Sequence, residues 1–181
     1  MIHDQFNTKI AATAGKRSRP TATILDSQSV KSNCHGGDVG FDSGKKIKGL
    51  KRHILVDTLI MLRGVFITPA STPEREGSQG LLDRILDKLP WLKWIWADGG
   101  YGREAFANWV RLRKPCLDVE VVKRRESAKG FNILKRRWIV ERTFGLLMHQ
   151  RLLLRDYECS ESSAQTWIYI AMIRIQLRRL A

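Results

Sequence analysis

The order of strand-like and helix-like apolar runs is the feature that most constrains the fold of this chain. Short runs typical of strands come first, and runs with helical spacing then alternate with further strand-like runs. The predicted strands cover residues 21–30, 53–59, 60–67, 94–97 and 118–122. The predicted helices cover residues 76–89, 103–113, 131–153 and 164–180. This order predicts an α/β domain with a mixed sheet flanked by helices.

The length of 181 residues suits one domain, which we place at residues 21–181. Residues 1–20 are small, polar and basic, so we predict a linker or arm there. Residues 33–52 are rich in glycine and lysine and predict a loop that leads into a strand. The order of elements is that of the RNase H-like fold, although many other α/β domains also permit it.

The chain is strongly basic, with 32 lysines and arginines against 18 aspartates and glutamates and a net charge of +14. This excess favours a polyanionic partner, most simply nucleic acid. An anionic membrane surface is the rival interpretation, but no polybasic amphipathic anchor stands out. The apolar stretch at residues 167–173 is far too short to span a bilayer. The three cysteines are far apart and odd in number, which favours a reducing cytoplasm over a disulfide framework or a zinc site.

Three acidic residues occupy settings that suit chemistry on a phosphate backbone. Asp26 follows the strand-like run 23–25, and Asp98 ends the tryptophan-rich strand just before two glycines. Glu141 lies in an otherwise apolar stripe of a predicted helix, where an unpaired carboxylate is costly. That stripe comprises Leu134, Trp138, Glu141, Gly145, Met148 and Leu152. Carboxylates bind Mg²⁺, and the surrounding lysines and arginines can hold the polyanion. Asp57 has a setting similar to that of Asp26, but it fits a hairpin turn better.

Each acid also has a structural alternative that the pattern alone leaves open. Asp26 could end its strand as a turn residue, and Asp98 could cap the turn that follows it. Glu141 could be neutralised by Arg142, or by Arg137 one turn earlier in the helix.

A basic run between the first two long strands could clamp phosphates, although such runs are usually solvated loops. It contains Lys45, Lys46, Lys48, Lys51 and Arg52. The net charge favours contact with DNA. The sequence has no phosphate-binding glycine loop of the GxxxxGK[ST] or GxGxxG type, so NTP hydrolysis is disfavoured.

Six sequence blocks occur in an order that resembles one family. The blocks are DSQSVK (26–31), GKKIKG (44–49), KRHILVDTL (51–59), ADGGY (97–101), RRWIVERTFG (136–145) and RDYE (155–158). Together they resemble the DDE transposases of bacterial insertion sequences, specifically the IS-five group. The resemblance implies an RNase H-like catalytic core whose catalytic acids are Asp26, Asp98 and Glu141.

The resemblance also implies a reaction and its partners. In such enzymes the acids hold two divalent metal ions, Mg²⁺ or Mn²⁺. Hydrolysis at the transposon end comes first, and the freed 3′-OH then attacks target DNA. We expect a homo-oligomer on DNA and a bacterial cytoplasmic, nucleoid-associated location. The candidate DNA contacts are the five residues of the basic run together with Arg137, Arg142 and Arg151.

The chain departs from the family pattern before and within the core. The usual N-terminal DNA-binding region is absent, because only about 25 residues precede Asp26. We therefore expect a second-frame or truncated product, which works together with the product of an upstream frame. Ile60 replaces a usual glycine, which disfavours a positive φ there. Positions where related sequences place tryptophan or basic residues hold Leu146, Met148, His149 and Leu152.

Two other functions remain open from the sequence. The first is a truncated, inactive DNA-binding product that regulates or assembles with full-length transposase, and the altered glutamate helix favours it. The second is an RNase H-like nuclease that acts on structured nucleic acid.

Overall fold

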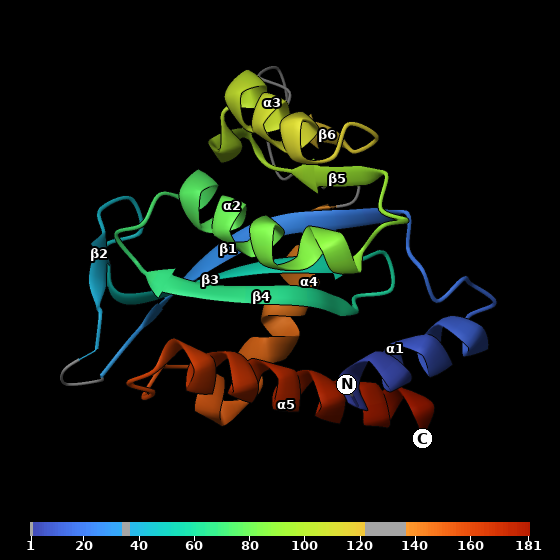
Figure 1. Ribbon diagram of the computed structural model, residues 1–181. Helices are drawn as coiled ribbons and strands as arrows, with labels where there is room; N and C mark the ends of the chain where they lie inside the picture. The colour runs from blue at the N-terminus through green and yellow to red at the C-terminus, as the bar shows by residue number, and fades with distance from the viewer. Residues whose placement is uncertain (1, 34–36, 122–136) are drawn as a thin grey trace, which may run out of the picture.

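A six-stranded sheet forms the centre of the computed structural model, which describes residues 2–33, 37–121 and 137–181 (Figure 1). The strands are β1 (Ala22–Lys31), β2 (Gly40–Asp42), β3 (Ile47–Asp57), β4 (Leu62–Pro69), β5 (Trp94–Ala97) and β6 (Asp118–Val121). β3 pairs antiparallel with β1, β2 and β4, whereas the β1–β5 and β5–β6 pairs are parallel. The sheet is therefore mixed, and β1 is the strand at which antiparallel pairing changes to parallel.

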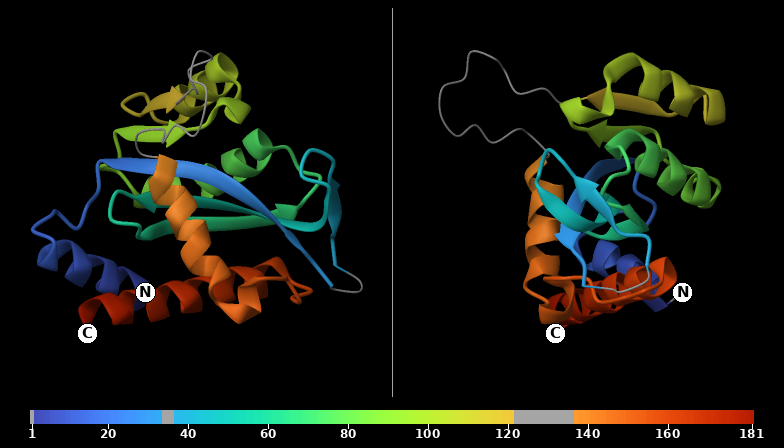
Figure 2. Two further views of the ribbon diagram at one scale, coloured as in Figure 1. Left: turned by 180° about the vertical axis from the view of Figure 1, so that it is seen from behind. Right: turned by 90° about the vertical axis from the view of Figure 1, so that its left-hand side faces the viewer.

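Helices cover both faces of this sheet. They are α1 (Ile2–Thr13), α2 (Glu74–Ile85), α3 (Arg103–Arg113), α4 (Arg137–Met148) and α5 (Glu161–Leu180). Three 3₁₀ turns, η1 (Leu86–Lys88), η2 (Gly99–Tyr101) and η3 (Arg151–Leu153), follow α2, β5 and α4. α2 and α3 lie on one side of the sheet, α4 and α5 lie on the other, and α1 lies beside α5 (Figures 1 and 2). The predicted α/β class is confirmed, and the arrangement is consistent with an RNase H-like fold.

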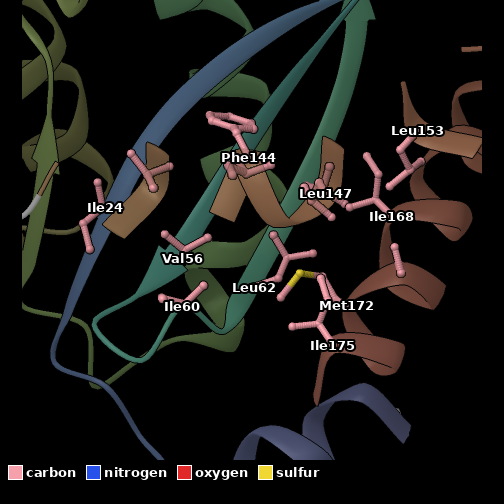
Figure 3. Packing of buried hydrophobic residues seen from close by; sticks show 14 of the residues in the cluster. Ile24, Val56, Ile60, Leu62, Phe144, Leu147, Leu153, Ile168, Met172 and Ile175 are labelled. Atoms are coloured by element: carbon pink, nitrogen blue, oxygen red, sulfur yellow. The ribbon is translucent and has the colours of Figure 1, made fainter. Parts of the chain in front are cut away.

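Alternation along the strands supplies two hydrophobic cores, one on each face. In β1, Ile24 enters the core under α4 and α5, whereas its neighbour Leu25 enters the core under α2 and α3. Trp96 and Ile95 of β5 divide in the same way. Figure 3 shows the first core, in which side chains from α4 and α5 meet side chains from the sheet. A strand buried on both faces favours consecutive apolar residues, as at Ile24 and Leu25 of β1 and at Ile54, Leu55 and Val56 of β3.

The hairpin between β3 and β4 turns at Asp57, as the sequence favoured for this residue. The Asp57 Oδ1 accepts hydrogen bonds from the backbone N–H groups of Leu59 and Met61, at 2.8 and 3.0 Å. Its Oδ2 is bound by the Arg63 guanidinium, with Nε at 3.0 Å. Ile60 adopts a φ of 67° in this turn, so the expectation that isoleucine avoids a positive φ here is wrong. Its side chain is buried in the core, which offsets the backbone strain.

The N-terminal segment is a helix for most of its length, so the predicted linker or arm is wrong for Ile2–Thr13. The buried residues of α1 include the polar side chains of His3 and Asn7. Asn7 Nδ2 donates to the Leu62 backbone oxygen at 3.3 Å, and its Oδ1 accepts from Gln176 Nε2 at 2.6 Å. The buried residues of α1 have helical spacing, but half of them are polar. A search for apolar residues at helical spacing therefore does not detect this helix.

The glutamate helix is shorter than predicted. Residues 131–136 lie outside the described residues, and α4 ends at Met148 instead of continuing to residue 153. The stripe that contains Glu141 faces outward, since the Trp138 side chain is 44% exposed. The buried face of α4 is formed by Ile139, Val140, Thr143, Phe144 and Leu147. Glu141 is therefore not a core carboxylate, and solvent or a ligand can reach it.

Smaller differences lie in β3, near α5 and at the cysteines. β3 begins at Ile47 instead of residue 53, and β2 also lies within the predicted loop. α5 begins at Glu161 instead of residue 164, and its N-cap is Ser160, whose Oγ accepts from the Ser163 backbone N–H at 3.2 Å. Cys159 is disulfide-bonded, contrary to the expectation of reduced cysteines. None of the helices in the described parts of the chain is long and apolar enough to cross a membrane.

A pair of helical glycines tests how closely α2 packs on the sheet. A Cβ at Gly77 of α2 would overlap the imidazole of buried His53 on β3, whereas a Cβ at Gly145 of α4 meets nothing within 4 Å. We expect Gly77→Ala to destabilise the protein by roughly 1 to 3 kcal/mol through overpacking. The matched Gly145→Ala should stabilise it by about 0.5–1 kcal/mol, since alanine favours the helix. Urea unfolding of both variants measures the difference, and equal effects would contradict the close α2–β3 contact.

Candidate active site

The parallel pairing of β1 with β5 brings the first two predicted acids together. Each paired β1 residue faces the residue 72 positions later, as Ala22 faces Trp94 and Ile24 faces Trp96. The same offset separates Asp26 from Asp98, so the register, continued two residues past the last pair, sets these acids opposite each other. This is the carboxyl end of β5, the end of a parallel strand at which open α/β sheets bind ligands.

The two carboxylate oxygens of Asp98 have different partners. Its Oδ1 accepts a hydrogen bond from the Gly100 backbone N–H at 2.8 Å, so it caps the turn η2. Its Oδ2 lies 3.8 Å from Nη2 of Arg137, the first residue of α4. The capping alternative is thus correct for one oxygen, and the second oxygen faces the glutamate helix.

Arg137 connects Asp98 to Glu141. The same Nη2 atom lies 3.6 Å from the Glu141 Oε1, so the alternative of an ion pair one turn apart is also present. The Glu141 side chain is 57% exposed, and such an open, long pair contributes little stability. The Arg137 guanidinium therefore lies between Asp98 and Glu141, and its buried Nε donor has no hydrogen-bond acceptor among the described residues.

Asp26 is a partly buried carboxyl with other carboxylates close by. Burial raises the pKa of Asp26 to about 6. A hydrogen bond from the Ser27 backbone N–H, at 2.7 Å, opposes the rise, and the negative charge of Asp98 adds to it. Arg137 lowers the pKa of Asp26, whereas Glu74 raises it. Asp26 is therefore within electrostatic reach of Asp98, Glu74 and Arg137.

Glu74, the first residue of α2, was missed by the sequence analysis. Its Oε2 would lie 2.9 Å from a Cβ placed on Gly100, and the Asp98 Oδ1 would lie 3.1 Å from the same point. Its Oε1 accepts a hydrogen bond from Lys45 Nζ at 3.0 Å. Acidic residues are common in the first turn of a helix because they interact with its dipole, so no sequence signal distinguished this one. We call Asp26, Asp98, Glu141 and Glu74 the acid site.

Two residues of the basic run are not available to DNA in this structure. Lys51 is buried, donates to the Thr72 backbone oxygen at 2.7 Å and pairs with Asp42 at 3.5 Å. Arg52 is fully buried and binds the Leu153 backbone oxygen at 2.8 Å and the Asp156 carboxylate at 3.3 Å. Their prediction as DNA contacts is wrong here, because the middle of β3 is buried on both faces.

The remaining candidate DNA contacts are accessible. Lys45, Lys46 and Lys48 are exposed around the start of β3, and the Lys45 side chain reaches the acid site through Glu74. Arg142 on α4 and Arg151 on η3 are also exposed. Arg137 is intermediate in exposure and lies inside the acid site. Among the described residues, Lys45 and Arg137 are the candidates with a printed ion pair to the acids.

Comparison with protein families matches residues 17–175 to the transposase DDE domain. The chain belongs to this family. A search among curated proteins finds no match. The family confirms a transposase in general and implies DNA as its partner, whereas the IS-five group assignment stays a prediction.

The acid site of this DDE domain has the ligand chemistry for a divalent ion such as Mg²⁺ or Mn²⁺, since carboxylate oxygens are the donors that such ions prefer. Within residues 2–33, 37–121 and 137–181, no three His, Cys, Asp or Glu side chains lie close enough to hold one ion. The Arg137 guanidinium lies between Asp98 and Glu141 and marks a point where positive charge is stabilised. The donors therefore suit a divalent ion in their chemistry, whereas the arrangement of the described residues does not bring three of them to one ion.

The raised pKa of Asp26 predicts a stability change with pH. Its pKa is about 6 in the folded protein against 3.8 for the ordinary group, so folding favours the protonated form. Its contribution to stability is present below about pH 4 and is lost as pH rises through 6. Relative to wild type, Asp26→Asn should gain roughly 2 to 3 kcal/mol between pH 4 and pH 7.5. Denaturant unfolding in chelating buffer measures this gain, and a difference independent of pH would contradict it.

Proposed function

We propose that this DDE domain catalyses metal-dependent DNA cleavage at transposon ends and transfer of the cut strand into target DNA. The observation that carries the proposal is the convergence of Asp26, Asp98 and Glu141 from β1, β5 and α4. The β1–β5 register sets the two aspartates opposite each other, and Arg137 connects Asp98 with Glu141. The family match supports the same reading.

Asp26, Asp98 and Glu141 would hold two divalent ions, Mg²⁺ or Mn²⁺. Bound there, the ions supply Lewis-acid charge beside the scissile phosphate. In the first reaction a water oxygen bonds to phosphorus and the P–O3′ bond breaks, which leaves a 3′-OH on the transposon end. In the second, that 3′-OH attacks a phosphodiester of target DNA and one target strand end leaves. The protein itself contributes the carboxylates, the exposed cations around them and the alignment of the DNA.

The exposed cations are proposed to hold the DNA backbone. Lys46, Lys48, Arg142 and Arg151 are exposed and have no assigned role in the core, so they can neutralise phosphates. Arg137 would leave its present place between the acids and contact a phosphate instead. We further propose a homo-oligomer on DNA, an association with an upstream-frame product and a bacterial cytoplasmic, nucleoid-associated location.

A cleavage assay tests the chemistry. Purified protein with Mg²⁺ or Mn²⁺ is expected to nick DNA that carries its element's ends, and Asp98→Asn should lower the nicking rate at least about a thousandfold. The substitution removes one carboxylate charge from the acid site but keeps the side-chain oxygen that caps η2. Asp87→Asn, on exposed η1, changes the formal charge equally outside the acid site and should leave the rate unchanged.

Three outcomes separate the candidate functions. Metal-dependent nicking that survives Asp98→Asn would overturn the active-site assignment. DNA binding that is sensitive to salt, without cleavage in any metal, would favour the inactive regulatory product. Cleavage of structured DNA or RNA that lacks the element's ends would favour a general nuclease.

A further inference from the structure

The two carboxylate oxygens of Glu74, the first residue of α2, face two different groups. One oxygen, Oε1, is 3.0 Å from Lys45 Nζ. The other, Oε2, lies against Gly100, on the same side as the Asp98 Oδ1. Because both of these oxygens lie about 3 Å from one point, they are within about 6 Å of each other. Glu74 thus enters the acid site from the opposite layer to Glu141, since α2 and α4 lie on different sides of the sheet (Figure 2).

The buried side chain of Tyr101 lies beside the acid site, in the turn that Asp98 caps. Tyr101 is fully buried, and its hydroxyl accepts a hydrogen bond from Ser78 Oγ at 3.4 Å. Burial raises the pKa of the Tyr101 hydroxyl well above its usual value, and the charges of Asp26, Glu74 and Asp98 add to the rise. Asp26 of β1, Glu74 of α2 and Asp98 after β5 therefore lie within electrostatic range of the same hydroxyl group.

Lys45 is the counter-charge of Glu74 in this structure. It lies in the turn between β2 and β3, and Asp42 organises that turn by accepting from the Lys45 backbone N–H at 3.0 Å. The Glu74 side chain is only 25% exposed, whereas that of Lys45 is 42% exposed. Lys45 is therefore the more exposed partner, and its ammonium group is not part of the hydrogen bond from its backbone N–H that holds the turn.

We propose that Glu74 is a fourth carboxylate of the metal site, held by Lys45 in the metal-free protein and released to a divalent ion when one binds. The inference rests on the proposed metal-dependent function. It goes beyond it by adding a ligand from α2, so that the acids come from four elements and from both layers. A divalent ion takes oxygen ligands at about 2.1 Å, so a shift of a few ångströms brings the Glu74 and Asp98 oxygens into contact with one ion.

The neighbouring Glu76 offers a matched control. It lies two residues later in the same first turn of α2, carries the same charge and is exposed. Glu74→Gln and Glu76→Gln therefore change net charge, helix dipole and side-chain size equally. A difference between them reports on the position of the carboxylate alone.

Calorimetric titration of the full 181-residue chain with Mn²⁺ alone tests the proposal without any cleavage assay. Glu74→Gln should weaken Mn²⁺ binding about tenfold or more, the range seen when residues supporting a metal are changed. Glu76→Gln should stay within about twofold of wild type. Lys45→Met should bind Mn²⁺ as well as wild type or more tightly, because the ion no longer competes with the ammonium group.

The results separate this inference from the proposed function. If Asp98→Asn weakens Mn²⁺ binding and Glu74→Gln behaves like Glu76→Gln, the fourth ligand is wrong and the metal site stands. If Glu74→Gln and Lys45→Met weaken binding equally, Glu74 only positions Lys45 and the inference is again overturned. If wild type binds no Mn²⁺, the proposed function and the inference fall together.

Discussion

The parallel register between β1 and β5 is the constraint on which the acid site depends. Only three residue pairs define it, from Ala22–Trp94 to Ile24–Trp96. A slip of one residue would turn every following side chain of one strand to the opposite face. Asp26 would then no longer lie opposite Asp98, and Ile24 and Leu25 would exchange cores. The same apolar side chains that fill the two cores therefore fix the position of the acids.

Much of the fold could be predicted from local sequence patterns, and the features that could not be predicted share a physical cause. β5 and α3 have the predicted bounds because their periodicity is strong and glycine or proline lies close by. α1 was missed because its buried face contains His3 and Asn7, and Asn7 bonds to Leu62 and Gln176, which are distant in sequence. Glu74 was missed for the same kind of reason: its role depends on Gly100 and Lys45, which no local pattern connects to it.

Buried cations explain why net charge overstates the DNA-binding surface. Arg52 crosses the core to the segment between η3 and α5, where it joins the Leu153 carbonyl and Asp156. Removing one partner of such a pair leaves an uncompensated buried charge and costs about 3–5 kcal/mol. Asp42 of β2 likewise accepts a hydrogen bond from Ser29 and pairs with buried Lys51. Burial raises the pKa of Asp42, but the hydrogen bonds and the nearby lysines outweigh it and lower the pKa to about 2. Part of the basic composition thus holds the sheet together.

Arg137 and Lys45 have a common consequence for how this domain reaches its working state. Small structural metal sites are often unfolded without their ion, since nothing else neutralises the ligands. Here each half of the acid site carries its own internal cation, Arg137 beside Asp98 and Glu141, and Lys45 beside Glu74. These carboxylates are therefore neutralised from within the chain, and the domain does not need a bound metal ion in order to fold.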